Sequence, residues 1–131
     1  MPDGSSKWGN FMLRVELFVN DVEVSLSFYR DILGFEVVGE NATYRALRLG
    51  NSRLALQDIR TLEPDHPLAQ PWKRGLGVEI VLEVEEVTTL HQRVQACWAQ
   101  VTSLKQQVWG LTDFRVTDPD GYYWRITEKR S

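Results

Sequence analysis

The strongest constraint in this sequence is an internal duplication. When the chain is laid along itself with an offset of 65 residues, similar residues align in the same order. The aligned positions are Val15, Leu17, Val19, Asp21 and Val22 on Ile80, Leu82, Val84, Glu86 and Val87. Each half has about 50 residues, too few to bury an adequate hydrophobic core alone. The repeat therefore predicts two similar half-domains that share one core, through paired sheets or an exchanged partner.

Both halves predict the same order of elements. In the first half, alternation over residues 11–21 predicts a strand, and apolar residues at helical spacing predict a helix that ends at Gly34. The helical positions are Val22, Leu26, Tyr29 and Leu33. Three strands follow at 35–40, 43–50 and 52–59, the last two joined by Gly50 and Asn51, a pair that suits a tight hairpin. The second half predicts a strand at 78–87, a helix at 85–100, and strands at 101–107, 111–118 and 122–129. The fold class is α+β, with two tandem βαβββ modules.

The boundaries of these modules follow from local composition. Residues 1–10 are rich in Pro, Gly, Ser and Asn and are predicted to form a loose arm. Residues 11–131 are predicted to form a single domain, with module one at 11–60, a proline-containing linker at 61–75 and module two at 76–129.

Composition excludes several classes of partner. A net charge of −3 gives no general attraction to the phosphates of nucleic acid. The longest apolar runs are too short for a membrane span, and the N-terminus lacks the apolar core of a signal peptide, so we expect a cytoplasmic protein without membrane contact. The single cysteine, Cys97, excludes an internal disulfide and a cysteine zinc cluster, and we expect it to pack on the second helix.

Two motifs carry a resemblance to a known family. The pattern D-x-x-x-S-x-x-F-Y-x-x-x-L-G-F occupies residues 21–35, and D-P-D-G-Y occupies residues 118–122. From Phe11 to Glu128 the chain resembles the vicinal-oxygen-chelate superfamily, which groups glyoxalase I, ring-cleaving dioxygenases, fosfomycin-resistance enzymes and bleomycin-resistance proteins. The resemblance implies that the two modules form a cupped mixed sheet around a small-molecule cavity, usually in a homodimer.

The resemblance also implies where catalytic members hold a divalent metal ion. The matching positions here are Arg14, Glu79, Arg125 and a place within residues 55–57, where only Gln57 is polar. A guanidinium group has no lone pair to offer a metal, so this set predicts neither a metal site nor a cofactor. The two histidines offer no replacement: His66 lies in the linker, and His91 is predicted to project from the second helix, away from the cup.

Strand alternation predicts which side chains face the cup. If Leu13 and its alternate neighbours meet the helix, Arg14, Glu16 and Phe18 face the cup. Glu79 faces it from the fifth strand, and Tyr123 and Arg125 face it from the last. Since a buried charge needs a partner, we expect Glu79 to pair with both Arg14 and Arg125. Two interpretations stay open: the ion network fills the space of a lost metal, or it recognises a ligand, with arginine binding a carboxylate or phosphate and Glu16 an amine.

Aromatic residues supply the remaining candidates. Five tryptophans are present, of which Trp98 and Trp124 are predicted to be core. Trp72 and Trp109 lie in loop contexts, where they would cover a cavity or form a subunit contact. The full set of predicted ligand-binding residues is Arg14, Glu16, Phe18, Gln57, Glu79, Trp109, Phe114, Tyr123 and Arg125.

The function that the sequence favours is small-molecule binding without catalysis. By resemblance to the bleomycin-resistance proteins, the mechanism would be sequestration, as in antibiotic resistance, of an aromatic or carboxylate-bearing ligand. No catalytic residue is assigned. The alternative is a metal-dependent, glyoxalase-like lyase or dioxygenase with atypical ligands. A third hypothesis is a structural or regulatory subunit that has lost its ligand.

Overall fold

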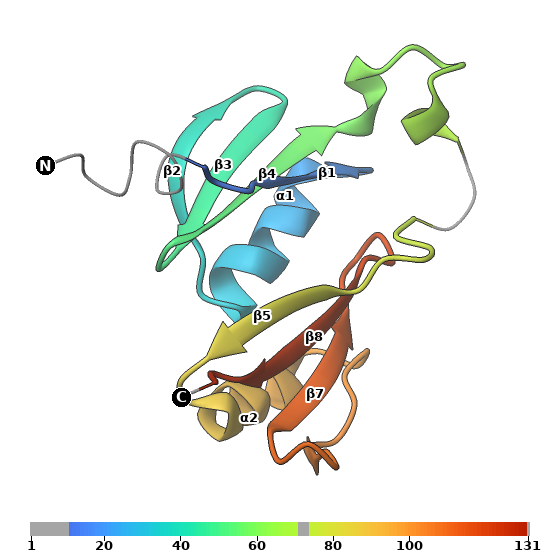
Figure 1. Ribbon diagram of the computed structural model, residues 1–131. Coiled ribbons are helices and arrows are strands. Elements are labelled where there is room, and N and C mark those ends of the chain that lie inside the picture. Colours follow the sequence, from blue (N-terminus) through green and yellow to red (C-terminus); the bar gives the residue numbers. More distant parts are fainter. Residues whose placement is uncertain (1–10, 71–73, 131) are drawn as a thin grey trace, which may run out of the picture.

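Two similar modules make up the fold (Figure 1). The computed structural model describes residues 11–70 and 74–130, so the predicted arm at 1–10 and Trp72 lie outside the described residues. Module one contains β1 (Val15–Val19), α1 (Val22–Leu26), the π-helical segment η2 (Ser27–Ile32), β2 (Glu36–Asn41), β3 (Tyr44–Leu49) and β4 (Ser52–Asp58). The short 3₁₀ segments η3 (Ile59–Thr61) and η4 (Pro67–Ala69) follow it. Module two contains β5 (Ile80–Val84), α2 (Val87–Cys97), β6 (Lys105–Gln106), β7 (Thr112–Thr117) and β8 (Tyr123–Glu128).

The duplication is confirmed by the sheet topology. The strand orders are β1-β4-β3-β2 and β5-β8-β7-β6, and each module pairs its first strand in parallel with its last. Val15 lies opposite Leu54 in the first sheet, and Ile80 lies opposite Trp124 in the second. The offset of 65 residues thus holds in three dimensions for the first strands, whereas the last strands correspond with an offset of 70.

The first helix forms where the apolar spacing predicts it. The Asp21 side chain caps its start by accepting hydrogen bonds from the backbone N–H groups of Glu23 and Val24. The four apolar positions at helical spacing are all buried: Val22, Leu26, Tyr29 and Leu33. Beyond Leu26 the helix continues as a wider π turn, and it ends at Gly34, whose φ of +95° favours glycine.

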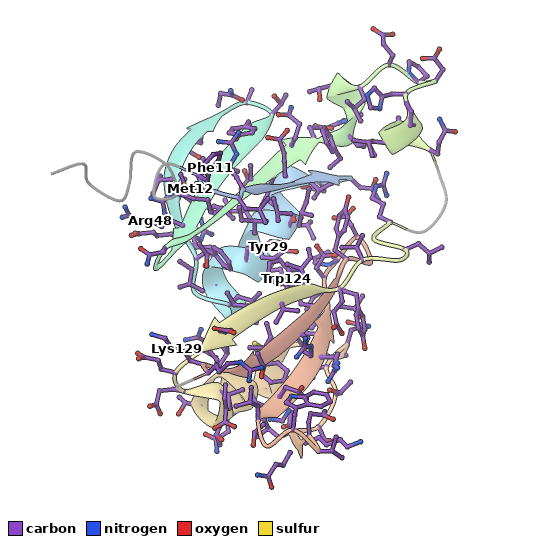
Figure 2. The ribbon with its side chains drawn as sticks, in the orientation of Figure 1. Phe11, Met12, Tyr29, Arg48, Trp124 and Lys129 are labelled. Carbon is purple, nitrogen blue, oxygen red and sulfur yellow. The ribbon has the colours of Figure 1, made fainter. Side chains whose placement is uncertain are left out.

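The two modules share one core, as their small size predicts. Figure 1 shows α1 between the two sheets. The Tyr29 ring lies 5.6 Å from the Trp124 ring, and the Phe28 ring lies 5.0 Å from Trp98 (Figure 2 labels Tyr29 and Trp124). Trp124 is 3% exposed, and both Trp98 and Trp124 pack in this core, as predicted. Neither helix could pack this way if each module folded alone.

Three local predictions are wrong. The strand at 101–107 shrinks to Lys105–Gln106, because the Arg115 N–H donates to the Thr102 hydroxyl, a side chain, and the ladder of backbone bonds is interrupted. Cys97 is exposed at the end of α2 and does not pack in the core. The expected break at residues 39–42 starts later, since β2 runs through a register shift at Gly39 and ends at Asn41.

Each four-stranded sheet has two edge strands in the described part of the chain, and the edges formed by β1 and β5 carry exposed apolar side chains. Among the described residues, β1 pairs only with β4, and β5 pairs only with β8. Leu13, which alternation places in the core, precedes β1 and is 86% exposed. The exposed apolar side chains near these two edges are Phe11, Met12, Leu13, Leu76, Val78 and Val81 (Figure 2 labels Phe11 and Met12). No helix within the described residues is long and apolar enough to cross a membrane.

Candidate functional site

The face of each sheet turned away from the helices is here called the open face. In module one, Leu17 and Val19 are buried on the helix side, so Glu16 and Phe18 lie on the open face, as predicted. In module two, Trp124 and Ile126 are buried on the helix side, so Tyr123 and Arg125 lie on the open face. The predicted direction of these side chains therefore agrees with the burial of their neighbours.

An ion cluster occupies the open face of module two. The Arg125 Nε donates to Glu79 Oε1 at 3.1 Å, and the Arg115 Nε lies 3.4 Å from Glu79 Oε2. Arg115 and Arg125 are direct cross-strand partners on β7 and β8. Like charges directly opposite one another destabilise a sheet, and Glu79 offsets that repulsion by contacting both guanidiniums.

A second carboxylate, that of Asp113, pairs with Arg115 of this cluster. The Arg115 Nη1 donates to Asp113 Oδ1 at 2.9 Å, and the Gln107 side-chain amide donates to the same oxygen at 2.8 Å. Asp113 is fully buried, and its Oδ2 has no hydrogen-bond partner among the described residues. Burial of this charge is costly unless it is paired, so Asp113 fixes the position of Arg115.

The prediction that Arg14 pairs with Glu79 in this cluster is wrong. Arg14 precedes β1 and is exposed, and the ion pairs of Glu79 within the described residues are to Arg125 and Arg115. Strand alternation predicts the side on which a residue lies but not the register between strands. That register brings Arg115, which the sequence analysis missed, to the position expected for Arg14.

The open face of module one also combines aromatic and polar side chains. Phe18 lies opposite Gln57, and Glu16 lies opposite Ala55. The Gln57 amide donates to the hydroxyl of Thr61 at 3.1 Å. A cleft of about 420 Å³ lies between β1 and the start of β5. Its lining includes Glu16, Phe18, Arg74, Tyr122 and Tyr123, together with apolar residues of both edges.

The remaining predicted ligand-binding residues lie in different places. Phe114 is 1% exposed and lies on the helix side of β7, where its ring packs 4.9 Å from the His91 ring. It belongs to the core, which corrects its assignment to the ligand site. Trp109 is 52% exposed in the turn between β6 and β7, and its role in ligand binding stays a prediction.

The family's metal positions can be tested by their chemistry. Because Val81 lies opposite Arg125 as Glu16 lies opposite Ala55, the module-one equivalent of Arg125 is Ala55. The four positions therefore hold two guanidiniums, a methyl group and Glu79, which is already paired with arginines. Within the described residues, no three His, Cys, Asp or Glu side chains are grouped to hold a metal ion. This donor set does not fit a divalent metal.

The two histidines are engaged elsewhere. His91 is buried on α2, and its Nε2 lies 2.8 Å from the Thr102 carbonyl oxygen. The His66 Nδ1 accepts a hydrogen bond from the backbone N–H of Leu68 and caps η4. Both side chains thus have local structural partners.

The D-P-D-G-Y turn joins the two modules. The Tyr29 hydroxyl donates to Asp118 Oδ2 at 2.6 Å and accepts from the Trp124 indole at 2.9 Å. Asp118 Oδ1 accepts the backbone N–H groups of Asp120 and Tyr122. Burial raises the pKa of Asp118 to about 6, and it raises the pKa of Tyr29 well above its ordinary value. Asp118 therefore connects the modules, whereas Tyr122 of the same turn lines the cleft beside β1.

Comparison with known proteins agrees with this architecture. A curated relative, the bleomycin resistance protein of Geobacillus stearothermophilus, is 31% identical over 112 residues, which cover 78% of this chain and 84% of the relative. A glyoxalase-related enzyme from Fulvimarina pelagi has the same fold, with a TM-score of 0.74 and 24% identity over 90% of this chain and 88% of the other. The bleomycin resistance determinant encoded on the transposon Tn5 gives a TM-score of 0.68 with 21% identity, over 92% and 99% of the two chains. The model of the Glyoxalase/Bleomycin resistance protein/Dioxygenase superfamily matches residues 12–126, and the chain belongs to that superfamily.

Proposed function

We propose that this protein binds a small organic molecule on its open faces, without a metal ion, and acts by sequestering it. The observation that carries the proposal is the residue set at the family's metal positions. Glu79 is the one carboxylate there, and it is engaged by two guanidiniums. The name of the 31% identical relative, bleomycin resistance protein, supports binding as the activity.

The surfaces offered to a ligand combine aromatic and charged groups. Phe18 and Tyr123 line the cleft between β1 and β5, together with the carboxylate of Glu16. An aromatic ligand can stack on such rings while charged groups orient it. Capture requires rigid walls, and β1 and β5 are held by parallel pairing with the last strands of their modules.

We further propose that the protein is a homodimer that uses the edges of β1 and β5. Unpaired strand edges are prone to pair with another chain, and contiguous exposed apolar residues indicate an interface. Leu13 and Val78 lie at these edges and are 86% and 59% exposed. A second copy at these edges would cover the apolar groups and would bring an open face of each chain to the same cavity.

Dimer formation can be tested with one charge. We expect Val78→Lys to produce a monomer of 15.2 kDa in light scattering, because the substitution places a charge in an apolar interface. Val108→Lys is the matched control, since Val108 is 100% exposed in the β6–β7 turn, away from both edges. A dimer that survives Val78→Lys at micromolar concentration, or a wild-type protein that is a monomer, would contradict this arrangement.

Binding can be tested by tryptophan fluorescence quenching with neutral, cationic and carboxylate-bearing aromatic compounds. We expect Phe18→Ala to weaken a quenching compound by roughly tenfold, as expected for the loss of one stacking contact with its buried area. Val24→Ala, on the outer side of α1, is the control and should leave the affinity unchanged. Parallel titrations with nickel, zinc, iron and manganese should show no uptake of one ion per chain. Specific uptake that Glu79→Gln abolishes would overturn the proposal in favour of a metal-dependent enzyme.

A further inference from the structure

We propose that the open face of module two is a carboxylate-binding site. Arg125 and Arg115 would hold the anionic group of the ligand, and Glu79 would hold the two guanidiniums in position. The inference rests on the proposed binding function and names the chemical class of the ligand. It differs from the sequence-based expectation in its second arginine, which comes from β7.

The geometry keeps the two arginines side by side. Arg115 and Arg125 are cross-strand partners, and Glu79 approaches each through its Nε, at 3.4 Å and 3.1 Å. Contact at Nε uses one side edge of each guanidinium and leaves the end edge between its two Nη groups. In Arg115 the Nη1 group of that edge donates to Asp113, so Arg125 offers the fuller edge of the two. A guanidinium edge with two parallel N–H groups matches a carboxylate in a bidentate pair.

Most of the accessible, unused hydrogen-bonding groups of the cluster are donors. Both Nη groups of Arg125 lack an acceptor within the described part of the chain, as does Nη2 of Arg115. The acceptors are more fully used: each Glu79 oxygen contacts one guanidinium, Asp113 Oδ1 accepts two donors, and Asp113 Oδ2 is buried. A ligand that supplies acceptors therefore satisfies the free arginine donors.

Burial and charge set the strength of such a site. The side chains of Arg115 and Arg125 are 24% and 23% exposed, so their donors can be reached but are partly withdrawn from water. Two arginines balance two carboxylates, Glu79 and Asp113, so net charge does not attract an anion over long range. Selectivity must come from hydrogen-bond geometry at short range, which favours a planar carboxylate. For the same reason lysine is a poor substitute for arginine here.

Three aromatic probes of similar size and different charge test the class of ligand. Benzoate, benzamide and benzylamine should be titrated into the full chain while the arginine Nε–H signals are followed by ¹H–¹⁵N NMR. We expect benzoate to shift the signals of Arg125 and Arg115 and to bind at least about tenfold more tightly than either other probe, the effect of one charge-assisted pair. Benzamide or benzylamine binding as tightly as benzoate would overturn the inference.

Variants at Arg125 test whether benzoate binds at this cluster. Arg125→Gln should weaken benzoate about tenfold or more, and Arg125→Lys should recover only part of that loss. Arg30→Lys is the matched control, because Arg30 pairs with its neighbour Asp31 on the exterior of η2 and should leave benzoate affinity unchanged. Thermal unfolding of each variant shows that it is folded, and any Arg125 variant that binds benzoate like the wild type contradicts the assignment.

The same titration separates this inference from the proposed function. If flat neutral or cationic compounds bind and perturb Phe18 or Tyr123 while benzoate leaves Arg125 unaffected, the carboxylate site is wrong and small-molecule binding stands. If no aromatic compound of any charge binds the wild-type chain, both are wrong.

Discussion

Replacement of Trp124 by alanine is expected to lower the free energy of unfolding by about 3–5 kcal/mol, the range for a large aromatic side chain removed from a core. Trp124 is 3% exposed and belongs to β8 of module two. Its ring packs at 5.6 Å from Tyr29 of module one, and its indole N–H donates to the Tyr29 hydroxyl. The substitution removes both the apolar contact and this donor, so it weakens the joint between modules as well as the packing within one.

Urea unfolding followed by circular dichroism measures this loss. Trp109→Ala is the matched control, because Trp109 is 52% exposed and should change the free energy of unfolding by no more than about 0.5 kcal/mol. Because the modules share one core, the Trp124 variant should still unfold in a single transition at lower urea. Two separate transitions in the wild type, or a loss in Trp124→Ala no larger than the control, would contradict a shared core.

Much of the fold could be predicted because its signals are periodic and local. The alternation through Leu17 and Val19 and the helical spacing from Val22 to Leu33 are patterns of burial, and burial on one face is what folding selects. The internal repeat shows the same order of patterns a second time, which strengthens each of these predictions. The π turn at Ser27–Ile32 could not be predicted in this way, because the same buried positions suit either helix type.

The candidate site could be predicted in part, and the limit is physical. Alternation along one strand predicts the face of a side chain, and Glu16, Phe18 and Arg125 lie on the sheet face that it predicts. An ion pair also depends on the register between neighbouring strands, which the sequence of one strand does not determine. Arg115 and Asp113 lie on the same side of β7. The same alternation, applied to β7, would have predicted that Arg115 lies on the open face beside Arg125.

The D-P-D-G-Y turn shows how a family motif can have a structural role. The motif contributed to the family resemblance, yet Asp118 is 3% exposed and faces Tyr29 of the other module. It accepts three hydrogen bonds, from one hydroxyl and two backbone N–H groups. A carboxyl group is the short side chain that can accept all three, so the turn geometry and the module joint depend on the same residue.

The buried position of Asp118 makes the stability of the protein depend on pH. Burial raises the pKa of Asp118 from 3.8 to about 6, so between these values the folded state binds more protons than the unfolded state. The stability that Asp118 contributes is therefore fully present below about pH 4 and is lost as pH rises through about 6. A shift of this size corresponds to about 3 kcal/mol. Other groups that face Asp118 are Tyr29, which hydrogen-bonds to it, and Asp120, whose charge also raises its pKa.

Asp118→Asn should remove this dependence, because the amide keeps a hydrogen-bonding group of similar shape and does not ionise. The measurement is the free energy of unfolding in urea from pH 4 to pH 8, taken as the difference between wild type and variant. We expect that difference to change by about 2.5 kcal/mol from pH 4 to pH 8, with the wild type relatively more stable at low pH. Asp58→Asn is the control: Arg60 lowers the pKa of Asp58, so its contribution is lost only as pH falls below about 4, and the difference between wild type and this variant should stay flat from pH 4 to pH 8. A flat difference for Asp118→Asn would mean that its carboxyl group titrates alike in the folded and unfolded chains, and that burial at the module joint does not act on its charge.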